Sequence, residues 1–108
     1  MTKTIWKYRI EGVSGEFPIP QGGRVVHVER EQPSSREEYV SLWVEVDDKL
    51  PTEQRSFGVY GTGHPVPVDS EYLGTVTFFP LPIVVHAYEL GVEALLEKHV
   101  AAAKVRKP

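Results

Sequence analysis

The most constraining feature of this sequence is a run of strict two-residue alternation near its middle. From Tyr39 to Val46, aliphatic residues alternate with polar or aromatic ones. Because successive side chains of a strand point to opposite faces, the run predicts a strand with one buried aliphatic face. The predicted buried positions are Val40, Leu42, Val44 and Val46, and the opposite positions are Tyr39, Ser41, Trp43 and Glu45.

Five further segments have the composition of short strands and are separated by connections that contain Gly or Pro. No helical pattern lies between them, so the crossovers that parallel strands need are missing. The sequence therefore predicts a mainly β domain over residues 1–90, an antiparallel sandwich or small barrel of about six strands. Glu16–Gly23 is not expected to form a regular ladder, because Pro18 and Pro20 lack an amide donor. The five segments are Trp6–Ile10, Arg24–Arg30, Ser56–Tyr60, Tyr72–Phe79 and Ile83–Leu90.

The hydrophobic period changes at Gly91. Apolar residues then recur at the spacing of an amphipathic helix, which predicts one C-terminal helix ending near Val105. Residues 91–108 would form this helix and a tail, either within the same domain or as an oligomerisation arm. An apolar stripe and the free edges of the sheets both favour a homo-oligomer. The apolar positions are Val92, Leu95, Leu96, Val100 and Ala103.

Composition limits the classes of partner. The 108 residues carry a formal charge of −3 with Lys and Arg scattered among more numerous acids, which disfavours binding to double-stranded nucleic acid. No apolar run is long enough to cross a membrane, and the mixed N-terminus does not resemble a signal peptide, so we expect a cytoplasmic protein without membrane partners. The sequence has no cysteine and so no disulfide or thiolate nucleophile.

The segment Tyr60–Pro65 is the strongest candidate for a binding loop. Gly61 and Gly63 can take positive φ values, so that successive amides of the loop point toward one anion. The hydroxyl of Thr62 and the ring of His64 would add donors, and Tyr60 leads into the loop. The alternative is a hairpin turn in which both glycines are left-handed and the prolines stiffen the exit.

Outside the loop, Trp43 and Arg24 are the other predicted ligand-binding residues. Trp43 lies opposite the aliphatic stripe of its strand, where its ring could stack on a ligand, and Arg24 could supply a cation, as could Lys7 and Arg9. The four histidines lack the short spacings of metal ligands, so no metal, cofactor or catalytic residue is predicted. They are His27, His64, His86 and His99.

Several segments together resemble a family of small, uncharacterised bacterial and phage proteins. The similarity covers roughly residues 4–89, and the Gly-Thr-Gly-His-Pro run is its most specific part. It implies a phage or prophage source and assigns no activity, and the predicted helix lies beyond it. The segments are Ile-Trp-Lys-Tyr at 5–8, Phe-Pro-Ile-Pro-Gln-Gly at 17–22, Leu-Trp-Val-Glu-Val-Asp at 42–47, Phe-Gly-Val-Tyr-Gly-Thr-Gly-His-Pro-Val-Pro at 57–67, Tyr-Leu-Gly-Thr-Val at 72–76 and Val-Val-His-Ala-Tyr-Glu at 84–89.

These observations favour a non-enzymatic, phage-type binding protein. One hypothesis is capture of a small anionic, nucleotide-like ligand to counter host defence, which would place the protein in the host cytoplasm. A second is inhibition of a host protein through an exposed strand or aromatic face. A third is a hydrolase with His64 as its general acid–base group. Cations converging on the loop would favour the first hypothesis, whereas an exposed apolar patch would favour the second.

Overall fold

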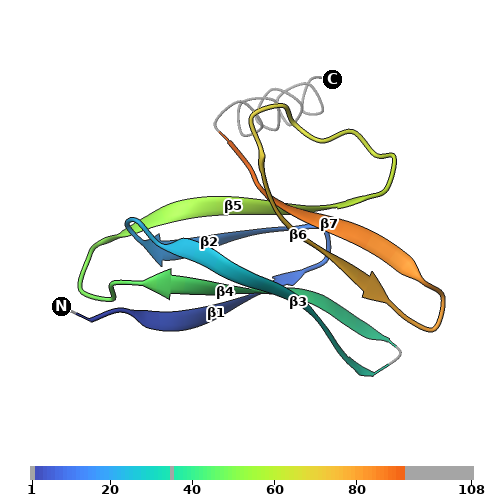
Figure 1. Ribbon diagram of the computed structural model, residues 1–108, viewed down its shortest axis with the longest axis horizontal. Helices are drawn as coiled ribbons and strands as arrows, with labels where there is room; N and C mark the ends of the chain where they lie inside the picture. Colours follow the sequence, from blue (N-terminus) through green and yellow to red (C-terminus); the bar gives the residue numbers. More distant parts are fainter. Residues whose placement is uncertain (1, 35, 92–108) are drawn as a thin grey trace, which may run out of the picture.

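The computed structural model describes residues 2–34 and 36–91, which form strands joined by turns and loops (Figure 1). The C-terminal helix predicted from Gly91 onward falls beyond the described residues, apart from Gly91 itself. The strands of the described part are β1 Thr4–Glu11, β2 Ser14–Pro20, β3 Arg24–Ser34, β4 Glu37–Val46, β5 Thr52–Gly61, β6 Glu71–Phe78 and β7 Ile83–Glu89.

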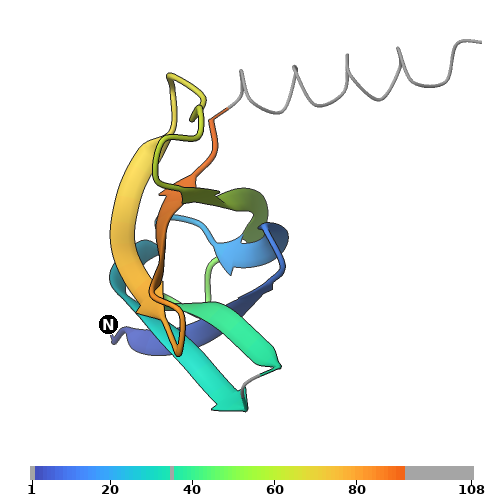
Figure 2. The ribbon, with the colours of Figure 1, turned by 90° about the vertical axis from the view of Figure 1, so that its right-hand side faces the viewer.

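The strands form two sheets that pack face to face (Figure 2). Sheet A has the order β1-β4-β3 and sheet B the order β2-β5-β7-β6, and every pair is antiparallel. The prediction of a mainly β, antiparallel architecture is thus confirmed. The described part has seven strands rather than six, and its two sheets do not join into a closed barrel.

The core lies between the two sheets. The predicted aliphatic face of β4 is buried throughout, with exposed fractions of 3% or less. Burying this much aliphatic surface between two sheets is the main favourable term for the fold. The other buried core residues are Ile10, Ile19, Phe57, Val76, Phe78 and Ala87.

β2 is the strand that the sequence pattern missed. It pairs with β5 along its whole length, from Ser14 opposite Gly58 to Pro20 opposite Thr52. The expectation that Pro18 and Pro20 exclude a ladder was wrong because β2 is an edge strand of sheet B. Only one side of an edge strand needs amide donors, so proline is tolerated there.

Glycine allows the edges of the two sheets to approach each other at β3 and β6. A Cβ added to Gly74 would lie 2.9 Å from the Cβ of Val28, closer than real side chains come. The register of β6 against β7 also shifts between Tyr72 and Gly74, as at a β-bulge. Further along this seam, the side-chain amide of Gln32 bonds both the N–H and the carbonyl oxygen of Phe79.

Candidate binding face

The outer surface of sheet B brings together residues from three strands. The register places Tyr60, His86 and Thr75 in one row across β5, β7 and β6, and Tyr88 and Tyr72 in the next row. Thr62 reaches the same surface from the turn after β5, where its hydroxyl contacts His86. We call this surface the tyrosine face and define it as Tyr60, Thr62, Tyr72, Thr75, His86 and Tyr88.

His86 lies at the centre of the tyrosine face and uses both ring nitrogens. Its Nε2 is 2.9 Å from Oγ1 of Thr62, and its Nδ1 is 2.9 Å from Oγ1 of Thr75. The hydroxyl of Tyr72 extends the chain, 2.6 Å from Thr75 Oγ1. When an imidazole is neutral, it has one donor and one acceptor nitrogen, and in that state one threonine hydroxyl donates to the ring and the other accepts from it. This chain of bonds fixes the orientation of side chains from β6, from β7 and from the turn after β5.

The three tyrosines pack against one another. The ring of Tyr88 meets those of Tyr60 and Tyr72 edge to face, with centroids 5.8 and 5.5 Å apart. Tyr60 also lies over Gly58, where an added Cβ would meet its ring at 2.9 Å. Burial raises the pKa of Tyr60 above its ordinary value. Such edge-to-face contacts hold the rings in defined positions before any partner arrives.

The predicted binding loop is a tight turn at the rim of this face. The amide of His64 donates to the carbonyl oxygen of Gly61 at 3.1 Å, and Gly63 has a φ of +87°. The expectation that both glycines take positive φ is wrong for Gly61, because it is the last residue of β5 and pairs with Val85. The His64 ring instead lies close to Gly61, 3.3 Å from the position of an added Cβ. The His64 amide that an anion nest would use is thus already bonded within the turn.

The other two predicted ligand-binding residues lie in sheet A. Trp43 is on the outer surface of β4, with Lys7 Nζ 5.5 Å from its ring centroid and the His27 ring 5.4 Å away. Arg24 begins β3, and its Nη2 is 3.9 Å from Oε1 of Glu45. The structure therefore gathers Tyr60 and the loop residues on one sheet and places Trp43 and Arg24 on the other.

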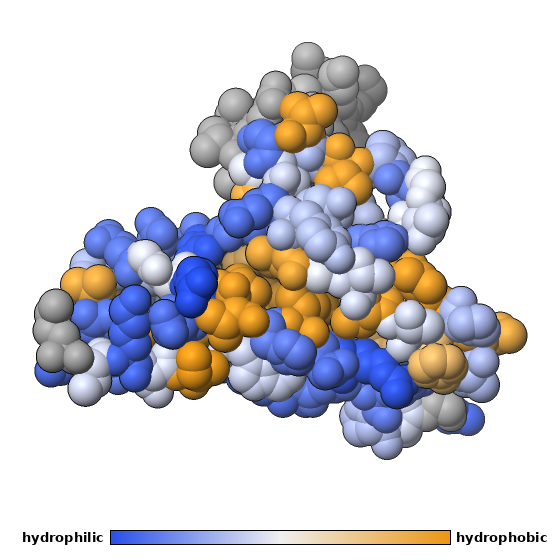
Figure 3. Space-filling view, in the orientation of Figure 1, coloured by the Kyte–Doolittle hydropathy of each residue, from blue (hydrophilic) through white to orange (hydrophobic). Residues whose placement is uncertain are grey.

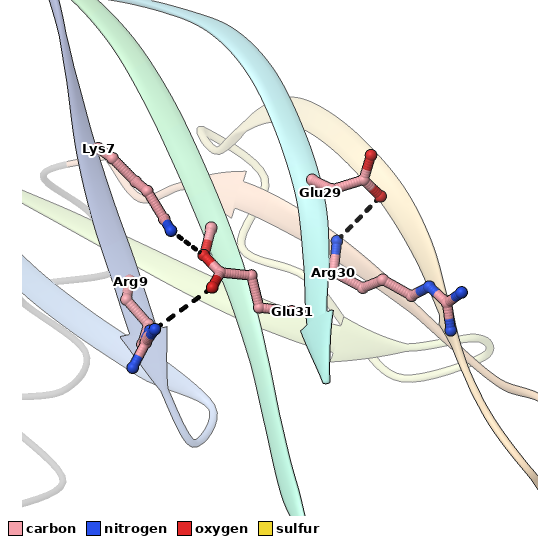
Figure 4. Close-up of polar contacts among 6 residues, drawn as sticks. Lys7, Arg9, Glu29, Arg30 and Glu31 are labelled. Atoms are coloured by element: carbon pink, nitrogen blue, oxygen red, sulfur yellow. Dashed lines mark hydrogen bonds and ion pairs between the residues drawn. The ribbon is translucent and has the colours of Figure 1, made fainter. Parts of the chain in front are cut away.

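Glu31 organises the charged outer surface of sheet A. Its carboxylate forms an ion pair with Lys7 and lies 3.3 Å from Arg9 Nη2 (Figure 4). It also accepts a hydrogen bond from Ser41 Oγ at 2.5 Å. Hydrogen bonds from Lys7 and Ser41 lower the Glu31 pKa to about 2, and the charge of Arg9 adds to the effect. Two of the three cations predicted to assist Trp43, Lys7 and Arg9, are thus already paired with a carboxylate.

The hairpin between β6 and β7 carries exposed apolar residues. Phe79, Leu81, Ile83 and Val84 expose between 38% and 76% of their surface, and we call this group the apolar hairpin. Val84 shares the outer surface of β7 with His86 and Tyr88, since strand side chains alternate. The tyrosine face therefore continues along β7 into the apolar hairpin. In Figure 3 hydrophobic residues gather at the middle and right of the molecule, whereas its lower part is mainly hydrophilic.

Comparison with known families gives one match. The model of a family described as a domain of unknown function, DUF7352, matches residues 1–96. The chain belongs to this family. No curated protein and no solved structure shows a significant match. Because the function of this family is unknown, membership assigns no activity to the tyrosine face. The role of this face is inferred from its geometry.

Two classes of site can be checked directly on the described residues. No group of three or more His, Asp or Glu side chains there is arranged to hold a metal ion. No helix within residues 2–34 and 36–91 is long and apolar enough to span a membrane.

Sequence reasoning missed the centre of the tyrosine face. The sequence assigns neither His86 nor Tyr88 to a binding site, since His86 lacks the short spacing of a metal ligand. The available signal was alternation along the predicted strand Ile83–Leu90, which places His86 and Tyr88 on one side. The partners of this pair, Tyr60 and Thr75, come from strands whose register the pattern does not specify.

Proposed function

We propose that this member of DUF7352 is a non-enzymatic binding domain whose tyrosine face and apolar hairpin together dock onto a protein partner. The observation that carries the proposal is the continuity of an ordered, uncharged aromatic surface with an exposed apolar one along β7. Tyrosine is enriched at protein interfaces because it contributes a large contact area and a hydrogen-bonding hydroxyl with little conformational entropy to lose.

The lack of charge on this surface supports a protein partner over an anionic ligand. In the described strands, the outward positions of β5, β7 and β6 carry no Asp, Glu, Lys or Arg. Charged residues make up 25% of the chain, so this surface differs from the average. A nucleotide-like ligand would need cations near its phosphates, whereas the centre of a protein interface is depleted of charge.

The apolar hairpin supports the same choice. Exposed apolar patches on soluble domains mark interaction sites, because covering them removes hydrocarbon surface from water. Leu81 and Phe79 have no polar group with which to bind a sugar or phosphate. A partner that covers both surfaces would bury the hairpin and satisfy the outer hydroxyls of the tyrosine face, the arrangement expected of an inhibitor of a host protein.

Site-specific photo-crosslinking in bacterial cells tests the proposal. A crosslinking amino acid is placed at Tyr72 or at Val84, and the matched control is placed at Val26, an exposed position on β3 in sheet A. We expect the same protein to be captured from the first two positions and not from the third. Capture that is equal at all three positions, or absent from Tyr72 and Val84, would contradict the proposal.

The captured protein is then purified and its affinity is measured by calorimetry. We expect Tyr72→Ala and Tyr88→Ala each to weaken binding by at least about tenfold, as at interface positions that contribute strongly. Lys7→Ala, on the charged surface of sheet A, is the control and should leave binding unchanged. Capture of a second copy of this chain would identify the partner as a homo-oligomer contact. Binding of linear or cyclic nucleotides that is lost in Gly63→Val would favour the anionic-ligand alternative instead.

A further inference from the structure

A polar cavity opens at the end of the sandwich opposite the apolar hairpin. It has a volume of about 320 Å³, and it lies where the turn between β2 and β3 meets the beginning of β6 and the end of β7. This volume is at the lower end of the range for small-molecule sites. The described residues that line it are Gly22, Gly23, Arg24, Val25, Arg55, Glu71, Leu73 and Glu89.

Two of the lining charges neutralise each other. Arg55 donates from Nε and Nη2 to the two carboxylate oxygens of Glu89, each at 2.6 Å, and from Nη1 to the carbonyl oxygen of Gly23 at 2.5 Å. All three guanidinium nitrogens are thus bonded, and both side chains are mostly buried. This pair is therefore part of the cavity wall, and neither of its charges is available to a ligand.

The other two charged residues of the cavity, Arg24 and Glu71, make much weaker contacts with the described residues. Arg24 exposes 74% of its side chain, and its nearest described carboxylate, Glu45, is 3.9 Å away, which is beyond hydrogen-bond distance. Glu71 forms no ion pair with any described residue. The pKa of Arg55 is raised mainly by its hydrogen bonds to Glu89, and the negative charges of Glu89, Glu53 and Glu71 add to this effect. One guanidinium and one carboxylate therefore flank the same small cavity, beside the apolar side chains of Val25 and Leu73.

We propose that this cavity binds a small zwitterion of the α-amino acid type. The ammonium group would pair with Glu71, the carboxylate with Arg24, and an aliphatic side chain would rest on Val25 and Leu73. A single anion would be repelled by Glu71, and a single cation by Arg24. The zwitterion is the class of ligand that satisfies both groups at once. This site is independent of the tyrosine face, which lies on the outer surface of sheet B.

The test is a titration of the full chain, monitored by two-dimensional NMR of its backbone amides. Three probes share one isobutyl group: L-leucine carries both charges, 4-methylpentanoate carries only the carboxylate, and 3-methylbutylamine carries only the ammonium. We expect leucine to shift the amide resonances of Gly22, Gly23 and Leu73 saturably. Each single-charge probe should bind at least about tenfold more weakly, the loss expected for one charge-assisted hydrogen bond.

Matched variants assign the effect to the cavity. Glu71→Gln and Arg24→Gln should each lower the affinity for leucine by at least about tenfold. Glu38→Gln, which changes a carboxylate at the opposite end of the sandwich, should leave it unchanged. Both Glu71 and Arg24 are exposed, so these variants should retain the fold, which the dispersion of the same spectra reports. The proposal is overturned if leucine produces no saturable shift, if the three probes act equally, or if Glu38→Gln weakens binding as much as Glu71→Gln.

Discussion

Arg55 and Glu89 form a bidentate ion pair that joins β5 to β7 on the inner side of sheet B. The pair is diagonal in the ladder, because Glu89 lies opposite Phe57, two residues beyond Arg55. The third nitrogen of the guanidinium bonds the carbonyl oxygen of Gly23, so the same side chain also holds the turn between β2 and β3. The pair thus closes the end of the sandwich just beyond the buried ring of Phe57.

Removing one partner of this pair should destabilise the fold. We expect Glu89→Gln to lower the free energy of unfolding by about 2 kcal/mol, because it leaves the guanidinium of Arg55 without its counter-charge in a poorly solvated position. The double variant Arg55→Met with Glu89→Leu should cost less than Glu89→Gln alone, since it leaves no unpaired charge. Urea denaturation measures both values.

The control for this prediction is Arg24→Gln, which removes an exposed guanidinium. Its contact with Glu45 is long and solvated, so the expected loss is below about 1 kcal/mol. A loss from Glu89→Gln no larger than that from Arg24→Gln would mean that the Arg55 pair does not stabilise the fold.

Gly74 packs closely against Val28 at the seam between the two sheets. We expect Gly74→Ala to lower the free energy of unfolding by about 1–3 kcal/mol, because the new Cβ would overlap the Cβ of Val28 and push β6 away from β3. A double-mutant cycle with Val28→Gly checks the cause. In that background the same substitution should cost clearly less, and additive losses would place the effect elsewhere.

The sequence was informative about the fold where a strand buries only one face. The alternation from Val40 to Val46 predicted the buried side of β4, because each second residue there must avoid water. It was misleading at Pro18 and Pro20, because a composition signal cannot tell an edge strand from a central one. Whether a missing donor matters depends on which side of the strand is paired, and that is decided by the position of β2 beside β5.

The candidate face was predictable only in part. Tyr60 and Thr62 were identified from the glycine-containing turn, which is a local signal. Trp43 was assigned to the correct side of its strand, but pairing of β4 with β1 and β3 puts that side on the other sheet. The central contact between Thr62 and His86 depends on the register of β5 against β7, which is set by long-range packing.

Substitutions at Gly63 and Gly61, in and before the turn after β5, distinguish backbone strain from side-chain contact. We expect Gly63→Ala to lower the free energy of unfolding by about 1 kcal/mol, because φ is +87° there and nothing lies within 4 Å of the added Cβ. Gly63→Asn should cost less, since asparagine tolerates the left-handed region.

Gly61→Ala is the matched control for this turn. Its φ is not positive, and the neighbouring His64 ring is exposed and free to shift, so the loss should be smaller than for Gly63→Ala. Thermal denaturation of the three variants gives the order. If Gly61→Ala is the most destabilising, contact with His64 rather than backbone strain limits the turn.

Glu31 should make the stability of the fold sensitive to acid. Its pKa is about 2 in the folded protein, against an ordinary value of 4.5, so the unfolded chain binds a proton more readily than the folded one. The stabilisation is therefore complete above about pH 4.5 and is lost as the pH falls toward 2.

Glu31→Gln cannot ionise and lacks this contribution. We expect its melting temperature to lie below that of the wild type at pH 6 and to converge with it near pH 2. Glu38→Gln, which has no ion pair among the described residues, should show a smaller change with pH. A constant gap between wild type and Glu31→Gln from pH 6 to pH 2 would mean that the contacts of Glu31 with Lys7, Arg9 and Ser41 do not depend on its charge.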